Sequence, residues 1–451
     1  MDSNKFICGD NSLKIKVSDR TFAEVEAMPG FKYERPVKQS AFLRWLMKTL
    51  SAGELKSTHF TYRNIGMERL KQGEPCLVLM NHSAFIDLKM AATILYPRPF
   101  HIVTTVDGFV GKNSLMRHLG CIPARKFITD TEMVSDIYNA LHKLNSSVLM
   151  YPEASYSFDG TATPLPKSVG KALKLFHVPV VMIRTYGAFL HDPLYNGLRP
   201  RKVNVSADVT YLLSAEEVHD KTVDELNQIL KDNFTFDSFE WQRENHVRVN
   251  EPFRAEGLER VLYNCPECLT EGKMVSSGTH IRCAACGADF ELTEYGEIRR
   301  SDVLNKIKKN DSGQKERIPE FHSIPDWYAG ERVSVDLELK TGNYFMRAPV
   351  RILTLVNTDA IYHVGSGVLT HDKDGFRLEG CAGALHYIQS ALASYSVYAD
   401  YFWYEIGDMI CIGTPQMQFY CFPENTEVNV AKLRLAAEEL YKMKAKRAES
   451  Q

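Results

Sequence analysis

Short apolar runs alternate with helical patterns between residues 75 and 190, and this alternation constrains the fold more than any other feature of the chain. The strand-like runs cover residues 75–80, 101–106, 147–151 and 178–183, and the helical patterns cover 84–95, 132–144 and 170–176. Because a crossover helix returns the chain parallel to the preceding strand, the pattern predicts a mainly parallel α/β sheet with helices on both faces. Ligands of such sheets bind beyond the carboxyl ends of the strands, so residues that directly follow a strand are candidate functional residues.

Length and composition place further limits on the chain. At 451 residues it exceeds one ordinary core and suggests two to four domains. The formal net charge of −2 gives no basic footprint for nucleic acid, so we expect no nucleic-acid partner. The first ten residues lack the apolar core of a secretory signal, and no apolar run approaches the roughly 20 residues that span a bilayer. Any membrane contact is therefore expected to be peripheral.

The segment Asn81–Asp87 (NHSAFID) follows the first buried strand and opens a helix. This placement puts His82 in the turn and Asp87 in the first helical turn, where the carboxylate can reach the imidazole. A histidine held by an aspartate is a general base for a hydroxyl nucleophile. The free N–H groups of the helix start could face a phosphate or a developing oxyanion. His219 and Asp224 repeat the spacing in a polar helical stretch with no strand before it, so the spacing alone is weak evidence.

Three further segments follow in order: Gly120–Lys126 (GCIPARK), Tyr151–Ser157 (YPEASYS) and Val178–Val180 (VPV). Together with Asn81–Asp87 they resemble the motifs of the glycerolipid acyltransferase family typified by lysophosphatidic acid acyltransferases. The motifs of that family are NHxxxxD, a Gly-to-Arg segment, F-P-E-G-T-R-S, and V-P-V/I followed by apolar residues. The resemblance covers about residues 40–250 and implies an acyltransferase domain.

The resemblance also implies roles for individual residues. His82 would be the general base and Asp87 its partner, in the transfer of an acyl chain from acyl-CoA or acyl-carrier-protein to a lysophospholipid-like hydroxyl. The acceptor it favours is 1-acyl-glycerol-3-phosphate. Lys126 aligns more naturally than Arg125 with the arginine that meets the acceptor's phosphate, and Glu153 would hold the acceptor site together through hydrogen bonds. The substrate-binding residues expected on this basis are Asn81, Arg125, Lys126, Glu153, Ser155, Tyr156 and Lys167.

The third motif departs from the family pattern. Its Gly and Arg are replaced by Ala154 and Tyr156, and its leading Phe by Tyr151. A tyrosine hydroxyl donates one neutral hydrogen bond but supplies no charge to a phosphate. Either Lys167 or Lys171 replaces the arginine, or the acceptor is not a simple lysophosphatidate. The departure also leaves open a non-catalytic lipid-binding adaptor with a degenerate acyltransferase fold, whereas the absence of a G-x-S-x-G elbow argues against a serine hydrolase.

Cysteines occur in two C-x-x-C pairs separated by 14 residues: Cys265, Cys268, Cys283 and Cys286. Each pair aims two thiolates at one point, and four thiolates bind Zn²⁺ tetrahedrally. The intervening segment fits a β-hairpin, so the sequence predicts a zinc ribbon whose zinc is structural, because no position is left for water or substrate. The other six cysteines are scattered, which suits a reducing compartment better than a disulfide framework.

The remainder of the chain divides around a basic run, Arg299–Arg317, that we interpret as a solvated linker or a contact for anionic headgroups. After Pro325 the pattern becomes strand-like and then ends in an amphipathic helix at 429–445, which predicts a small β-barrel or sandwich capped by a helix. The strand-like segments are 332–339, 351–356, 361–365, 402–407, 409–413 and 417–422.

The predicted division is an N-terminal extension (1–36), an acyltransferase domain (37–258), a zinc ribbon (259–298), a basic linker (299–320) and a β-rich domain with a terminal helix (321–451). The segment after Ser40 predicts an amphipathic helix that either packs on its own domain or binds a membrane surface through Phe42, Leu43, Trp45, Leu46 and Leu50. Expected partners are a lipid acceptor, an acyl donor, which includes acyl carrier protein as one alternative, and a membrane. The expected location is the cytoplasm, at the cytoplasmic face of a membrane.

Overall fold

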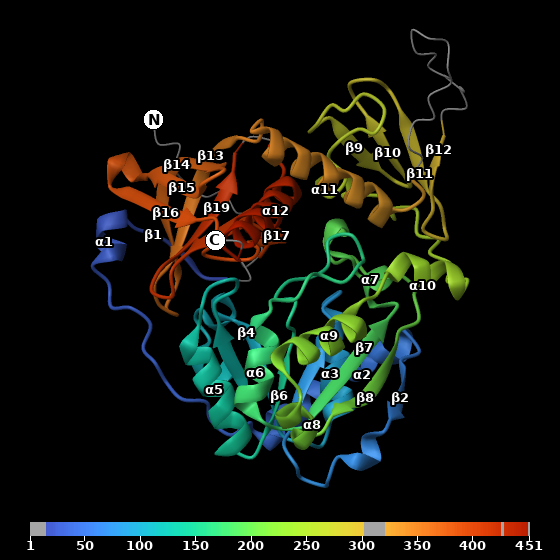
Figure 1. Cartoon of the computed structure of the whole chain (residues 1–451), viewed down its shortest axis with the longest axis vertical. Helices are drawn as coiled ribbons and strands as arrows, with labels where there is room; N and C mark the ends of the chain where they lie inside the picture. The colour runs from blue at the N-terminus through green and yellow to red at the C-terminus, as the bar shows by residue number, and fades with distance from the viewer. Residues whose placement is uncertain (1–14, 302–320, 425–427, 450–451) are drawn as a thin grey trace.

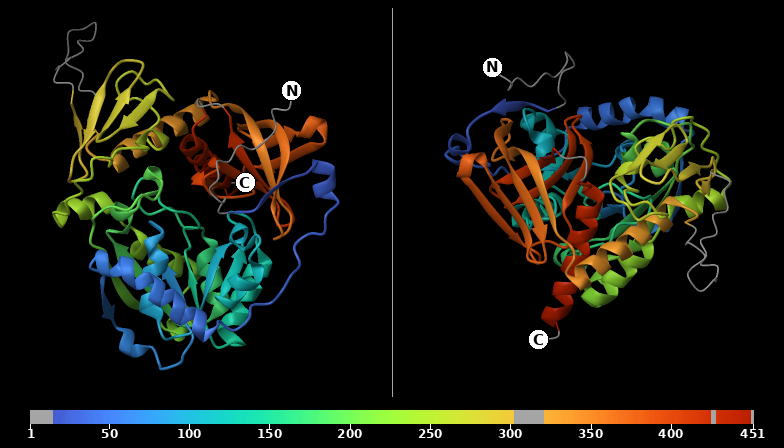
Figure 2. Two further views of the ribbon diagram at one scale, coloured as in Figure 1. Left: turned by 180° about the vertical axis from the view of Figure 1, so that it is seen from behind. Right: turned by 90° about the horizontal axis from the view of Figure 1, so that it is seen from above.

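A computed structural model describes residues 15–301, 321–424 and 428–449 (Figure 1). Most of the predicted basic linker and the first 14 residues of the predicted extension lie outside the described residues. The chain forms an N-terminal α/β domain, a small cysteine-containing module and a β-rich C-terminal domain (Figures 1 and 2). Among the residues that the structure describes, no helix combines the length and apolarity needed to cross a membrane.

The α/β domain is built on a seven-stranded sheet in the order β2-β8-β7-β3-β6-β4-β5. All neighbouring pairs are parallel except β7–β8, which confirms the predicted mainly parallel sheet. The strands are β2 (Thr61–Ile65), β3 (Leu77–Met80), β4 (Phe100–Thr105), β5 (Cys121–Ala124), β6 (Ser147–Met150), β7 (Val180–Tyr186) and β8 (Ser206–Leu213).

Helices cover both faces of this sheet. The side chains of β3 are buried on both faces, which explains why its sequence is continuously apolar. Leu77 and Leu79 pack into the cluster with α5, α6 and α9, whereas Val78 and Met80 pack into the cluster with α2 and α3. The helices are α2 (Ala41–Ser57), α3 (Ile86–Leu95), α4 (Asn113–His118), α5 (Thr131–His142), α6 (Ser168–Phe176), α7 (Ala188–His191), α8 (Ala215–Asp220), α9 (Val223–Phe234) and α10 (Ser238–Glu244).

The predicted helical stretch from residue 214 to 239 is three helices. Ser214 and Thr222 each form a capping box, and Asp237 caps a third helix through two backbone N–H groups. These caps restart the helix where a single pattern had been expected.

The cysteine-containing module is a four-stranded antiparallel sheet in the order β12-β11-β10-β9. The predicted hairpin between the two cysteine pairs is confirmed, because β9 and β10 pair on either side of a turn at Gly278. The strands are β9 (Met274–Ser277), β10 (His280–Cys283), β11 (Asp289–Leu292) and β12 (Ile298–Arg300).

The C-terminal domain is a curved, mainly antiparallel sheet in the order β16-β15-β14-β13-β19-β18-β17, packed against a terminal helix (Figure 2). This arrangement confirms the predicted β-rich domain with a terminal helix. The elements are α11 (Ile324–Thr341), β13 (Met346–Leu355), β14 (Ile361–Asp372), β15 (Gly375–Gly380), β16 (Leu385–Ser390), β17 (Tyr398–Trp403), β18 (Gly407–Gly413), β19 (Gln418–Pro423) and α12 (Val430–Glu449).

The strand predicted at 332–339 was wrong, because this segment lies within helix α11. Ser323 caps the helix and Pro325 occupies its first turn, where a missing N–H costs nothing. Trp327, Glu331 and Val335 are buried at helical spacing, which the alternating apolar residues of the segment had obscured.

The described part of the predicted N-terminal extension joins the C-terminal domain. Strand β1 (Val17–Asp19) pairs in parallel with β14, and helix α1 (Phe22–Glu26) places Phe22 within 6.4 Å of the Phe419 ring centroid. Residues from opposite ends of the sequence therefore share one sheet.

Candidate active site

The turn between β3 and α3 holds His82 and Asp87 together. The Nδ1 atom of His82 lies 3.4 Å from Asp87 Oδ2. The Asp87 carboxylate is fully buried, and it accepts hydrogen bonds from the backbone N–H groups of Ser83 at 2.7 Å and Ala84 at 3.0 Å. Its other oxygen accepts from Thr185 Oγ1 at 3.3 Å. This network fixes the carboxylate, and a proton on Nδ1 leaves Nε2 of His82 as the acceptor.

The expectation that free N–H groups at the start of α3 face a substrate is wrong for the first three. Ser83 and Ala84 donate to Asp87, and the N–H of Phe85 donates to Asp192 Oδ2 at 3.2 Å. Asp192 is held in turn by His191 Nδ1 at 2.9 Å. The carboxylates at this helix start already take up the positive end of its dipole.

Glu153 joins the first and third motifs. Its Oε2 accepts from the backbone N–H of His82 at 2.7 Å, and its Oε1 accepts from the N–H of Thr163 at 2.7 Å. The N–H of Ser157 donates to the His82 carbonyl at 3.0 Å. Both backbone polar groups of His82 are therefore hydrogen-bonded to the loop of the third motif. Burial raises the pKa of Glu153 to about 7, and the two N–H donors oppose this rise.

Two tyrosines enclose the imidazole of His82. The ring centroids of Tyr151 and Tyr156 lie 4.0 Å and 4.2 Å from that of His82. Burial lowers the pKa of His82, and the Asp87 carboxylate partly offsets this effect. The imidazole is therefore neutral at physiological pH, as a general base must be.

The other predicted substrate residues differ in their surroundings. Asn81 Oδ1 accepts from the Thr185 N–H at 2.8 Å, so this side chain braces the strand ends. Arg125 Nη1 pairs with Asp130 at 3.0 Å and with Glu132 at 3.2 Å. Ser155 Oγ is buried without a hydrogen-bond partner among the described residues, and Ser155 does not line the cavity described below.

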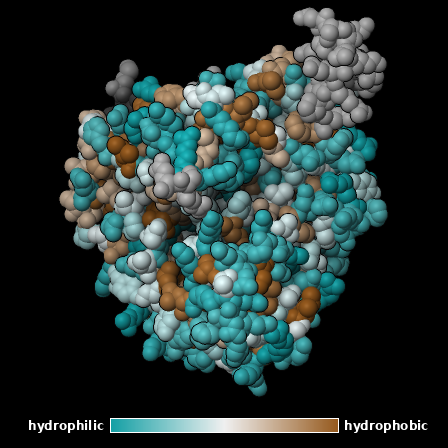
Figure 3. All heavy atoms as spheres, in the orientation of Figure 1, coloured by the Kyte–Doolittle hydropathy of each residue, from teal (hydrophilic) through white to brown (hydrophobic). Residues whose placement is uncertain are grey.

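A cavity of about 1580 Å³ opens at His82, between the α/β domain and the C-terminal domain. The surface is hollowed there, with apolar side chains at the rim (Figure 3). The predicted residues Arg125, Lys126, Tyr156 and Lys167 line this cavity. It is larger than the roughly 300–1,000 Å³ of common small-molecule pockets, as a lipid-sized substrate requires.

The C-terminal domain supplies cavity residues that sequence reasoning missed. They come from β17, from the turn after it and from α12, and no motif marks them: Tyr398, Asp400, Tyr401, Phe402, Trp403, Tyr404, Tyr441 and Lys442. The one available signal was the aromatic density of the segment 398–404, of which only residues 402–404 had been assigned, to the predicted strand 402–407.

Comparison with known proteins is consistent with this site. The acyltransferase family model matches residues 62–185, which include the His82 turn and Glu153. The human 1-acyl-sn-glycerol-3-phosphate acyltransferase beta is 23% identical over 158 residues, which are 34% of this chain and 55% of that protein. The chain contains an acyltransferase domain of this family.

These matches cover only part of this chain and part of each similar protein. The chain spans about half the length of the curated relative it matches. The crystal structure of the 1-acyl-sn-glycerophosphate acyltransferase PlsC from Thermotoga maritima matches with 14% identity and a TM-score of 0.34, over 42% of this chain and 76% of that one.

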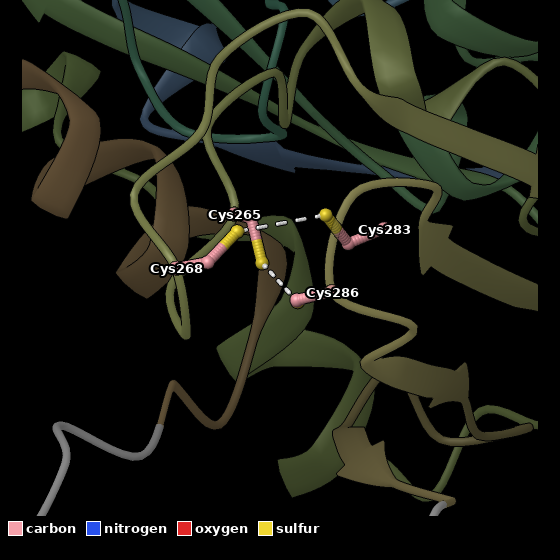
Figure 4. A group of neighbouring side chains, drawn as sticks. All are labelled: Cys265, Cys268, Cys283 and Cys286. Atoms are coloured by element: carbon pink, nitrogen blue, oxygen red, sulfur yellow. Dashed lines mark hydrogen bonds between the residues drawn. The ribbon is translucent and has the colours of Figure 1, made fainter.

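Beyond the acyltransferase domain, the four predicted cysteines converge (Figure 4). Their sulfur atoms all lie within 4.8 Å of one another, with Cys265 and Cys286 at 3.6 Å and Cys268 and Cys283 at 3.8 Å. Four thiolates about 2.3 Å from a central zinc stand about 3.8 Å apart, so the cluster fits a tetrahedral zinc ion.

Proposed function

We propose that the protein is an O-acyltransferase that moves an acyl chain from a thioester, acyl-CoA or acyl-carrier-protein, to a hydroxyl of a lysophospholipid-like acceptor. The observation that carries the proposal is His82, oriented by Asp87 and facing a lipid-sized cavity. The matched human relative is named for 1-acyl-glycerol-3-phosphate, which is therefore the first acceptor to test.

The geometry supports a direct transfer. The acceptor hydroxyl gives its proton to Nε2 of His82 as its oxygen attacks the thioester carbonyl carbon. The tetrahedral intermediate then collapses, the carbon–sulfur bond breaks, and the imidazolium returns the proton to the departing thiolate. Asp87 stabilises the imidazolium while it exists. The thioester is already activated, so this scheme needs no covalent enzyme intermediate.

The decisive experiment measures transfer of a labelled acyl group to a panel of lysolipids. We expect His82→Ala to lose about 10²–10⁴-fold in kcat/KM, because a positioned base supplies that factor. The matched control is His219→Ala, at an exposed histidine with the same spacing to an aspartate, which should stay close to the wild-type rate. Full activity in His82→Ala would remove His82 as the base, and no turnover with any donor and acceptor would favour the lipid-binding adaptor.

We further propose that the cysteine cluster holds one structural Zn²⁺, and that the protein acts at the cytoplasmic face of a membrane. Phe42 and Leu50 of α2 are 63% and 74% exposed, and they support the membrane contact. Glu54, on the same helix, lines the cavity at His82, so a lipid surface beneath α2 would lie close to the site.

A further inference from the structure

Lys126, the residue expected to meet the acceptor's phosphate, faces carboxylates from two domains. Its Nζ atom lies 4.2 Å from the centroid of the Tyr398 ring, and both residues line the cavity at His82. Burial lowers the pKa of Lys126, whereas Asp400 in β17 and Asp107 in the turn after β4 both raise it. Arg434, which is itself paired with Glu438, also lowers this pKa, so Lys126 lies among charges of both signs, two of which are the carboxylates of Asp400 and Asp107.

The C-terminal domain helps to position both carboxylates. Trp403 Nε1 donates to Asp107 Oδ2 at 3.1 Å and so joins β17 to the turn after β4. The other oxygen of Asp107 is buried and has no hydrogen-bond partner among the described residues. The Tyr398 hydroxyl lies 3.5 Å from Asp400 Oδ2. Burial raises the pKa of Asp400 to about 7, and the positive charge of Lys126 opposes this rise.

Several other cations of the cavity are held by acidic partners. Arg125 pairs with Asp130 and Glu132, Lys89 pairs with Glu54, and Lys442 pairs with Glu439. Tyr156 supplies no charge where the family motif has arginine. Lys167 and Lys171 also line the cavity and are the alternative phosphate ligands that the experiment must test.

We propose that this wall of the cavity selects against a phosphate monoester: the acceptor is a glycerolipid whose polar group carries no net charge, and Asp400 sets the preference. The proposal rests on the acyl transfer at His82 proposed above. A dianionic phosphate beside Lys126 would share the cavity wall with the Asp400 carboxylate, where like charges repel more strongly than in water. An uncharged or zwitterionic group avoids this repulsion and can use the ring face of Tyr398.

The test compares acceptors in the full-length protein with one acyl donor. The acceptors are 1-acylglycerol, lysophosphatidylcholine and 1-acyl-glycerol-3-phosphate, and the result is the ratio of their kcat/KM values. We expect the wild type to prefer the first two. Asp400→Asn should shift the ratio about tenfold toward the phosphate acceptor, because one opposing charge is removed, and Asp400→Glu should keep the wild-type ratio.

The matched control is Asp372→Asn. Asp372 belongs to the same domain and pairs with Arg377, but it does not line the cavity. Its replacement should leave the ratio unchanged. If Asp400→Asn fails to fold, Lys126→Ala replaces it. We expect that variant to change the KM for the phosphate acceptor less than threefold, because Lys126 is already matched by carboxylates.

Any of three results would overturn the proposal: a wild type that prefers the phosphate acceptor, an unchanged ratio in Asp400→Asn, or a tenfold rise in the KM for the phosphate acceptor in Lys126→Ala, Lys167→Ala or Lys171→Ala. The proposed acyl transfer fails separately. In that case neither the wild type nor His82→Ala turns over any of the three acceptors.

Discussion

The His82 turn and the cysteine cluster are both built from short sequence motifs, but the first site is open to a cavity and the second is closed. His82 lines the cavity, and its Nε2 atom is not used by the contact with Asp87. The hydroxyl of the neighbouring Ser155 has no hydrogen-bond partner among the described residues. In the cluster all four sulfur atoms face one another within 4.8 Å. An open site can lose the side chain that reacts and keep its fold, because Nε2 of His82 makes none of the hydrogen bonds that hold this turn. A closed site is part of the fold.

The largest expected effect that tests this contrast is at Asp87. Asp87→Asn keeps the shape of the side chain but removes the charge that orients and stabilises the His82 imidazolium. We expect a loss of at least about 10²-fold in kcat/KM with zinc content close to wild type. The protein should stay folded with a lower temperature of thermal unfolding, because the amide replaces one of the two oxygens that accept hydrogen bonds from Ser83, Ala84 and Thr185. The matched control is Asp224→Asn, at the exposed copy of the spacing. A variant at Asp87 that unfolds, or that loses zinc, would show that the turn is not an open site.

At the cysteines we expect a substitution to change zinc content and folding. Elemental analysis should find one zinc per chain, and Cys283→Ser should lose it and expose residues 259–298 to proteolysis. Metal binding by four thiolates contributes roughly 10 kcal/mol or more to small zinc modules, which have little core of their own. Cys381→Ser, at a cysteine outside the cluster, should retain the metal. Well under one zinc in protein with intact cysteines would contradict the proposal.

The sequence predicted the parts of the site whose geometry is local. Spacing and the preceding strand were enough to place His82 beside Asp87, because a turn between a strand and a helix allows few alternatives. The C-x-x-C pairs were equally local, since each knuckle is made within four residues.

Contacts between distant segments could not be predicted in this way. Trp403 reaches Asp107 across 296 positions, and no periodicity or motif encodes such a pairing. The parallel strand β1 on β14 is another example. Strand β2 was missed because its residues are all exposed and carry no apolar pattern, and α11 was misassigned because its alternating apolar residues imitate a strand.

A smaller effect is expected at the surface through which the open site would receive lipid. Phe42→Asp combined with Leu50→Asp should weaken binding to anionic vesicles about tenfold, because two exposed apolar side chains no longer enter the membrane interface. Wild-type binding should also fall with salt, since Arg44 and Lys48 lie on the same helix. Val333→Asp with Leu337→Asp, on the exposed face of α11, is the control. Normal vesicle binding by the α2 variant would remove this helix from the proposal.

The smallest expected effect is a difference in pH dependence between the His82 site and the cysteine cluster. Because burial lowers the pKa of His82, its imidazole remains a neutral base below pH 6.5, and the acidic limb of kcat/KM should lie below that value. The Asp87 carboxylate raises the same pKa, so Asp87→Asn should move the limb to still lower pH. Zinc is also released as its thiolates are protonated, but this release should have the same midpoint in both proteins. A limb near pH 7 that disappears in Glu153→Gln would instead assign the titration to Glu153, whose pKa is raised to about 7.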